Sequence, residues 1–242
     1  MERFLHIILI LHIIGGFTAL VSGLLAMVTP KGGKNHRLSG KFYFWGMTAV
    51  FISSILLSIF HHLPFLLMVG FFSYYMVVRG YRRLSLKKLG RGQHVSELDW
   101  LIALIAGAFI AGLLRWGIFR EFEGNSFGRV AIVFALLGVL FLFSDVKVYL
   151  FGPKDKMHWW YTHIGSMGGG YIATITAFVV VNFTLKPGWI LWLLPTVIGV
   201  PIIMVTIARY KKQFNKKQPA SSGANLQQDD TVTRDSEREG VV

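Results

Sequence analysis

The sequence predicts an all-α fold, a polytopic transmembrane bundle of about seven helices. The first observation is composition: hydrophobic residues make up 53% of the 242 residues and charged residues only 15%, whereas a soluble domain carries about 25% charged residues. The second is charge placement. The basic residues lie between long apolar runs and not along one face, which argues against nucleic acid as a partner and is typical of a multi-pass membrane protein.

Seven apolar segments each approach the roughly 20 residues that a membrane span needs. Prolines near the segment ends support these helix boundaries: Pro30 and Pro153 follow the first and fifth segments, and Pro64 opens the third. Ser96 and Asp99 have the spacing of a capping box before the fourth. The predicted helices cover residues 4–28, 41–60, 64–82, 98–119, 129–151, 159–183 and 188–210.

Orientation follows from the distribution of Lys and Arg. When the ends of the spans are counted with the connections, seventeen lie after the first, third and fifth spans and between Arg209 and Lys217, against four on the other side. This predicts an outer N-terminus and a cytoplasmic C-terminus. Residues 1–214 are expected to form the transmembrane domain and residues 215–242 a disordered cytoplasmic tail. The basic loops and tail should contact anionic lipids of a bacterial inner membrane.

The first span places His12 on a face of small residues, Gly16, Ala19, Gly23 and Ala26. A stripe of small residues marks the face that a second helix approaches closely. His12 is therefore expected to point into the bundle, where it serves either as an interhelical hydrogen-bond partner or as a cofactor or proton site.

The sixth span carries His163 about one turn inside its cytoplasmic end, and Asp145 of the fifth span lies at a similar depth. A pair between these two residues would neutralise both groups and orient the imidazole. The same pair also fits a purely structural role. His158 lies at the start of the same span.

The stretch GKNHRLSGKFYFW adds His36 on the cytoplasmic side. Depth allows His36 to share one metal with His163 or His158, but not His12 with His163. The sequence thus predicts the His36 ring within about 10 Å of His163, a distance that one water, a transition metal or haem b could bridge.

Three neighbours in this stretch have simpler expected roles. Arg37 is a candidate for binding a lipid phosphate. Ser39 is expected to cap the second helix and Gly40 to open it.

Several of these residues also form a pattern. His12 precedes Gly15-Gly16, the motif His36-Arg37-x-x-Gly40 comes before aromatic residues, and His163 precedes Met167 in a later helix. The pattern resembles an uncharacterised bacterial multi-pass membrane protein family. The resemblance marks these positions as sites of interest without implying an activity.

Two classes of function follow. A transmembrane redox protein would use His36 and His163 as ligands of haem b or a transition metal, with Asp145 orienting one ring. A proton-coupled transporter of a small solute would use His12, Asp145 and His163 as protonatable stations. A non-catalytic structural or sensory role also stays open. The histidines on the cytoplasmic side favour the redox interpretation.

Overall fold

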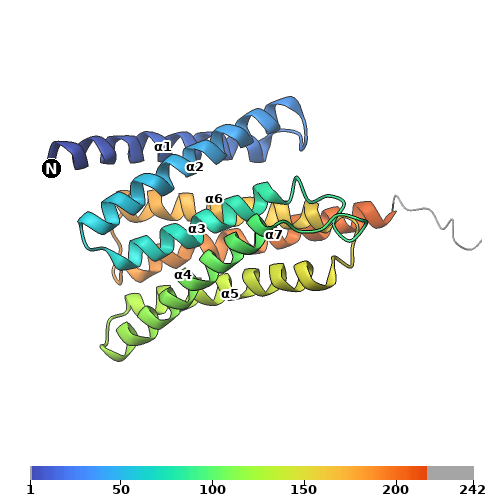
Figure 1. Cartoon of the computed structure of the whole chain (residues 1–242). Coiled ribbons are helices and arrows are strands. Elements are labelled where there is room, and N and C mark those ends of the chain that lie inside the picture. Colours follow the sequence, from blue (N-terminus) through green and yellow to red (C-terminus); the bar gives the residue numbers. More distant parts are fainter. Residues whose placement is uncertain (1, 217–242) are drawn as a thin grey trace, which may run out of the picture. The chain divides into compact units, whose positions relative to one another are not determined.

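The computed structural model describes residues 2–216, and in that part of the chain it is entirely helical apart from short connections (Figure 1). This confirms the all-α prediction. The helices are α1 (Glu2–Val28), α2 (Lys34–Phe60), α3 (Pro64–Arg82), α4 (Glu97–Phe122), α5 (Phe127–Phe151), α6 (His158–Asn182) and α7 (Trp189–Lys216).

Six of the seven described helices are long and apolar enough to cross a membrane, so the chain is an integral multi-pass membrane protein. The exception is α3, with 19 residues. It contacts α2, α4, α5 and α6, so protein covers most of its surface. A helix enclosed in this way does not need the continuous apolar surface that lipid demands of the others.

Residues 2–203 belong to one compact unit, and helix α7 continues from it to Lys216. The predicted tail lies, from residue 217 onwards, outside the described residues. The predicted orientation across the membrane stays a prediction.

The second helix begins earlier than its sequence suggests. Gly33 is its N-cap residue, and the turn before it uses Gly32 at a φ of 78°. Arg37 N–H then donates to Gly33 O at 3.0 Å. The expectation that Ser39 caps this helix and Gly40 opens it is therefore wrong, because the Gly-Gly pair makes the turn seven residues sooner. His36 consequently lies in the first turn of α2 and not in a loop.

The fourth helix begins as predicted. Ser96 is its N-cap residue and forms a capping box with Asp99. The backbone N–H of Ser96 donates to Asp99 Oδ2 at 2.9 Å, which satisfies a donor that the helix itself leaves unpaired.

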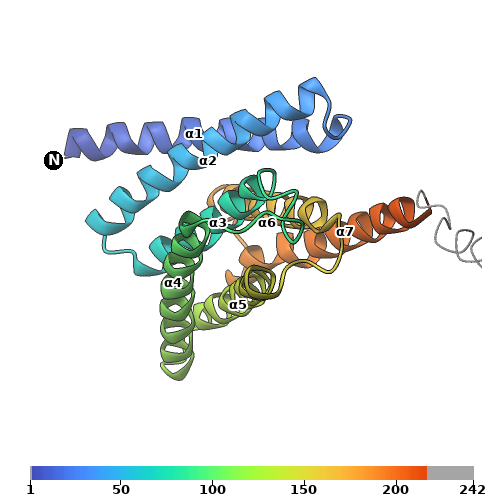
Figure 2. The ribbon, with the colours of Figure 1, turned by 45° about the vertical axis from the view of Figure 1, so that its right-hand side comes forward.

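The small-residue face of α1 packs mainly on α2. A Cβ on Gly15 would lie 3.2 Å from Gly46 O, and a Cβ on Gly46 would lie 3.1 Å from Ala19 N, so the two backbones approach closely. The sixth helix reaches the same face one turn further along, where a Cβ on Gly23 would lie 2.5 Å from the Tyr171 ring. The first and sixth helices are therefore in contact, but the closest neighbour of α1 is α2. Figures 1 and 2 show α1 and α2 side by side as a hairpin.

The largest buried apolar cluster joins α3, α4 and α5. Aromatic pairs lie around it, such as Phe72 with Phe134, whose ring centroids are 5.8 Å apart. This packing fixes the position of α3, whose last turns carry the charged residues described below. The buried members of the cluster are Phe72, Met76, Leu113, Val130, Ala131, Phe134 and Ala135.

Candidate functional site

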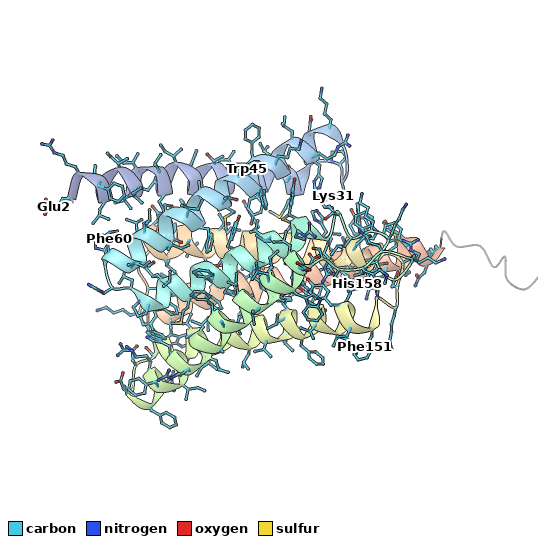
Figure 3. All side chains as sticks on the ribbon, viewed as in Figure 1. Glu2, Lys31, Trp45, Phe60, Phe151 and His158 are labelled. Carbon is cyan, nitrogen blue, oxygen red and sulfur yellow. The ribbon has the colours of Figure 1, made fainter. Side chains whose placement is uncertain are left out.

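His36 and His163 meet at one end of the helical unit. Their ring centroids are 6.4 Å apart and their planes are inclined by 76°, so the predicted approach to within about 10 Å is confirmed. Figure 3 shows Lys31 and His158 at this end, with Glu2 and Phe60 at the other. The pair therefore lies where the connections after α1 and α3 meet the start of α6.

Both rings are held through Nδ1. His36 Nδ1 lies 2.8 Å from Ala26 O, and His163 Nδ1 lies 2.9 Å from Gly80 O. A carbonyl oxygen can only accept a hydrogen bond, so in each ring Nδ1 carries the proton and donates it. In a neutral ring Nε2 then keeps its lone pair, which is the arrangement found in metal-ligating histidines.

The two accepting carbonyls are available because each lies in the last turn of a helix. The final four carbonyls of an α-helix have no partner within that helix, and Ala26 and Gly80 occupy such positions in α1 and α3. Lys31 adds a second donor to Ala26 O at 3.1 Å and one to Met27 O. Partial burial lowers the pKa of the Lys31 ammonium below its usual value. These bonds tie both histidines to helix ends.

Close contact between α3 and α6 brings Gly80 to His163. A Cβ on Gly80 would lie 3.0 Å from Met167 Cγ, 3.1 Å from Met167 N and 3.2 Å from Ser166 Cβ. Only glycine allows this approach without displacing the neighbouring helix. The position of the His163 ring therefore depends on a glycine of a different helix.

Asp145 does not orient His163, and this prediction is wrong. Its Oδ2 accepts from Tyr75 Oη at 2.8 Å, and its Oδ1 accepts from Arg79 Nε at 2.8 Å and from Arg83 Nη2. Two guanidinium cations thus bind the carboxylate, and a backbone carbonyl has taken the orienting role at His163. Charge-assisted bonds to two cations are stronger than one bond to an imidazole.

This ion cluster is buried and joins three helices. Asp145 is 1% exposed, Arg83 1% and Arg79 6%. Arg79 Nη1 also donates to Ser166 Oγ of α6 at 2.6 Å. The cluster thereby connects α3, α5 and α6 next to the histidine pair. The sequence does contain a signal for it, because Tyr75, Arg79 and Arg83 recur every four residues and so share one helix face.

A second ion pair stands beside it. Arg82 donates from Nε and Nη2 to the two oxygens of Asp99, at 2.9 and 3.0 Å. The bidentate geometry ties the end of α3 to the start of α4. Arg82 therefore has its own counter-ion and takes no part in the Asp145 cluster.

The remaining predicted site residues lie elsewhere. His12 Nδ1 lies 3.0 Å from Ser53 Oγ of α2, which is the interhelical hydrogen bond that the sequence left open. Ala26, whose carbonyl binds His36, is fourteen residues further along α1, or about 21 Å at the helical rise. The structure therefore does not bring His12 to the histidine pair.

His158 and Arg37 also take other positions. His158 Nε2 lies 3.1 Å from Thr162 Oγ1. His158 precedes His163 by five residues, so the two side chains leave α6 about 140° apart. Arg37 is exposed in the first turns of α2, which keeps it available to a lipid phosphate.

Within residues 2–216 no three His, Cys, Asp or Glu side chains gather in a metal-binding group. Among the described residues, the two histidines are what this site offers to a metal. Comparison with known proteins brings no match to a family profile, to a curated protein or to a solved structure. The site and the helices define a multi-pass membrane protein, and the resemblance to an uncharacterised multi-pass family stays a prediction.

Proposed function

We propose that this chain is a transmembrane redox protein in which His36 and His163 bind haem iron or another transition metal through Nε2. The observation that carries the proposal is the pairing itself. Two rings from different helices lie 6.4 Å apart, and each donates its Nδ1 proton to a carbonyl, which reserves Nε2 for a ligand.

The distance matches a metal between the rings. Two metal–nitrogen bonds of about 2.0–2.1 Å place the two ring nitrogens at most about 4.2 Å apart, and each ring centroid lies further from the metal than its nitrogen does. The observed centroid distance of 6.4 Å is compatible with one metal ion between the two rings. His36 and His163 would hold such a group, and a haem would supply the remaining ligands of its iron. Two protein ligands are then sufficient.

The protein would contribute orientation and enclosure. The helix-end carbonyls fix the tautomer and direction of both rings. Gly80 allows α3 and α6 to close behind His163. A bound haem or metal would supply one-electron chemistry.

Proton-coupled transport of a small solute has less support. Its three stations each have a different local partner: His12 has Ser53, Asp145 has two arginines, and His163 has Gly80. A proton path needs stations within hydrogen-bond reach or connected by water, and the length of α1 separates His12 from the others.

A non-catalytic structural role has one specific observation in its favour. The same Nδ1 bonds give acceptor partners to carbonyls in the last turns of α1 and α3, which the helices themselves leave unpaired. Under that interpretation the histidines stabilise the bundle and bind nothing.

Absorption spectroscopy of the purified full chain separates these functions. A haem protein shows a Soret band and split visible bands on reduction, and elemental analysis detects a metal without haem. We expect His36→Gln and His163→Gln to lose the signal, while His94→Gln, in the exposed connection after α3, retains it. A folded, colourless and metal-free protein from cells supplied with haem precursor and metals would contradict the proposal.

A further inference from the structure

A small pocket lies beside the buried ion cluster, between the connections that follow α3 and α5. It reaches the start of α6 and has a volume of about 10 Å³, which is room for one water-sized atom. Its wall is strongly basic. The lining residues are Arg83, Leu86, Lys87, Leu89, Pro153, Asp155, Lys156, His158 and Trp159.

The ion cluster behind the pocket carries excess positive charge. Arg79 and Arg83 share the single carboxylate of Asp145, so two cations face one anion. The nearby Asp99 cannot balance them, since both of its oxygens bind Arg82. A buried charge without a counter-ion is costly.

Arg83 also has an unused donor. Its side chain is almost fully buried, yet its Nη1 has no hydrogen-bond partner among the described residues. A buried donor left without an acceptor carries the full cost of its desolvation. Since Arg83 itself lines the pocket, an acceptor that entered there could satisfy the donor and offset the excess charge.

The pocket's other groups suit an anion as well. Lys87 Nζ lies 4.8 Å from the centroid of the Trp159 ring, which holds the ammonium beside the pocket by a cation–π contact. Asp155 is the one carboxylate among the described lining residues, and it accepts from Met157 N–H at 2.7 Å next to the start of α6. Lys156 is exposed beside it.

We propose that this pocket binds a phosphate group, with one oxygen inserted towards Arg83 and the others held by Lys87 and Lys156. The small volume limits entry to a single oxygen, as a phosphate approaching from the surface would offer. The group can come from the headgroup of phosphatidic acid or from free phosphate. The inference does not depend on the histidine pair. The proposed ligands Arg83, Lys87 and Lys156 take no part in the hydrogen bonds that hold the His36 and His163 rings.

Two matched double variants test the proposal in the full chain. Lys87→Gln with Lys156→Gln removes two lining charges. Lys88→Gln with Lys154→Gln removes two neighbouring charges from the same connections, and neither residue lines the pocket. Both variants have the same net charge, so long-range electrostatics are equal. Arg83 stays unchanged because it also holds Asp145.

Binding is measured with two probes. Inorganic phosphate is titrated against the protein in neutral detergent at constant ionic strength, and retention of phosphatidic acid is measured in phosphatidylcholine nanodiscs. We expect the lining variant to bind at least one probe about tenfold more weakly than the wild type, because each lost charge-assisted bond is a strong one. The control variant should match the wild type within about twofold.

The two probes identify the source of the phosphate. Binding of inorganic phosphate indicates a soluble ligand, and binding of phosphatidic acid alone indicates a lipid headgroup. Equal losses in the two double variants would overturn the proposal, because they would show general attraction to a basic surface. Failure of the wild type to bind either probe would overturn it as well.

Discussion

Replacing Asp145 with Asn is expected to destabilise the protein far more than replacing a comparable surface carboxylate. The substitution keeps the shape of the side chain but leaves Arg79 and Arg83 without their counter-ion. The Arg79–Asp145 distance is 2.8 Å, with the side chains 5% and 1% exposed. Breaking a buried pair by removing one partner costs about 3–5 kcal/mol. For a chain of this size that corresponds to a loss of roughly 6–20 °C in Tm.

The matched control is Glu123→Gln. Its partner Arg120 also lies at 2.8 Å, but these side chains are 40% and 42% exposed. An exposed pair contributes about 0–1 kcal/mol, so this variant should keep nearly the wild-type Tm. Bond length is the same in the two pairs, and burial is what differs.

The assay is thermal unfolding of the purified variants in one detergent, followed by loss of native tryptophan fluorescence. A double variant, Asp145→Asn with Arg83→Gln, should recover part of the loss, because it removes one of the two unpaired cations. Equal Tm values for Asp145→Asn and Glu123→Gln would refute the reasoning, since burial would then have no effect on the strength of the pair.

Three further predictions test the fold. Gly80→Ala should destabilise the protein by about 1–3 kcal/mol, because the added Cβ would press on Met167. Its control, Gly40→Ala, has nothing within 4 Å of the added Cβ and should be neutral or stabilising by up to about 1 kcal/mol. Unfolding in detergent measures both variants, and equal effects would contradict the contact between Gly80 and Met167. Ser96→Ala should cost about 0.5–2 kcal/mol through loss of the capping box, with Ser85→Ala, in an exposed turn, as its control. Reporter fusions after Gly33 and Gly90 should both report cytoplasm, and a periplasmic signal at both would reverse the predicted orientation.

The sequence was sufficient to predict the helices because lipid imposes a simple rule on their length and polarity. The weakest boundary was the start of the second helix. Lys34, Asn35 and His36 are polar, so hydropathy placed them in a loop, although Gly32 and Gly33 had already made the turn. A helix that extends beyond the apolar region gives no hydropathy signal there.

The meeting of His36 and His163 was also predictable, since the short connection after α1 limits where His36 can lie. The hydrogen-bond partners of the two rings could not be predicted from the sequence. Both rings bind backbone carbonyls, and residue identity carries no information about which carbonyl lies nearby. That depends on how α2 packs against α1 and α6 against α3.

The role of Asp145 was mispredicted for a different reason. The charge distribution that predicts orientation includes Arg79 and Arg83, although both side chains are buried. Counting charges by loop does not distinguish a cation at the headgroups from one bound to a carboxylate. The four-residue spacing of Tyr75, Arg79 and Arg83 was the signal that separates these cases.

The central claim is that His36 and His163 together hold a redox-active metal, and the content of haem and metal per chain tests it most directly. Protein purified from membranes should contain about one haem or one transition-metal ion per chain, bound through the two histidines. The His163→Gln variant should contain none and remain folded, and His94→Gln should match the wild type. A folded wild-type protein with neither haem nor metal, after growth with both supplied, would contradict the account and leave the two histidines as bonds between helix ends.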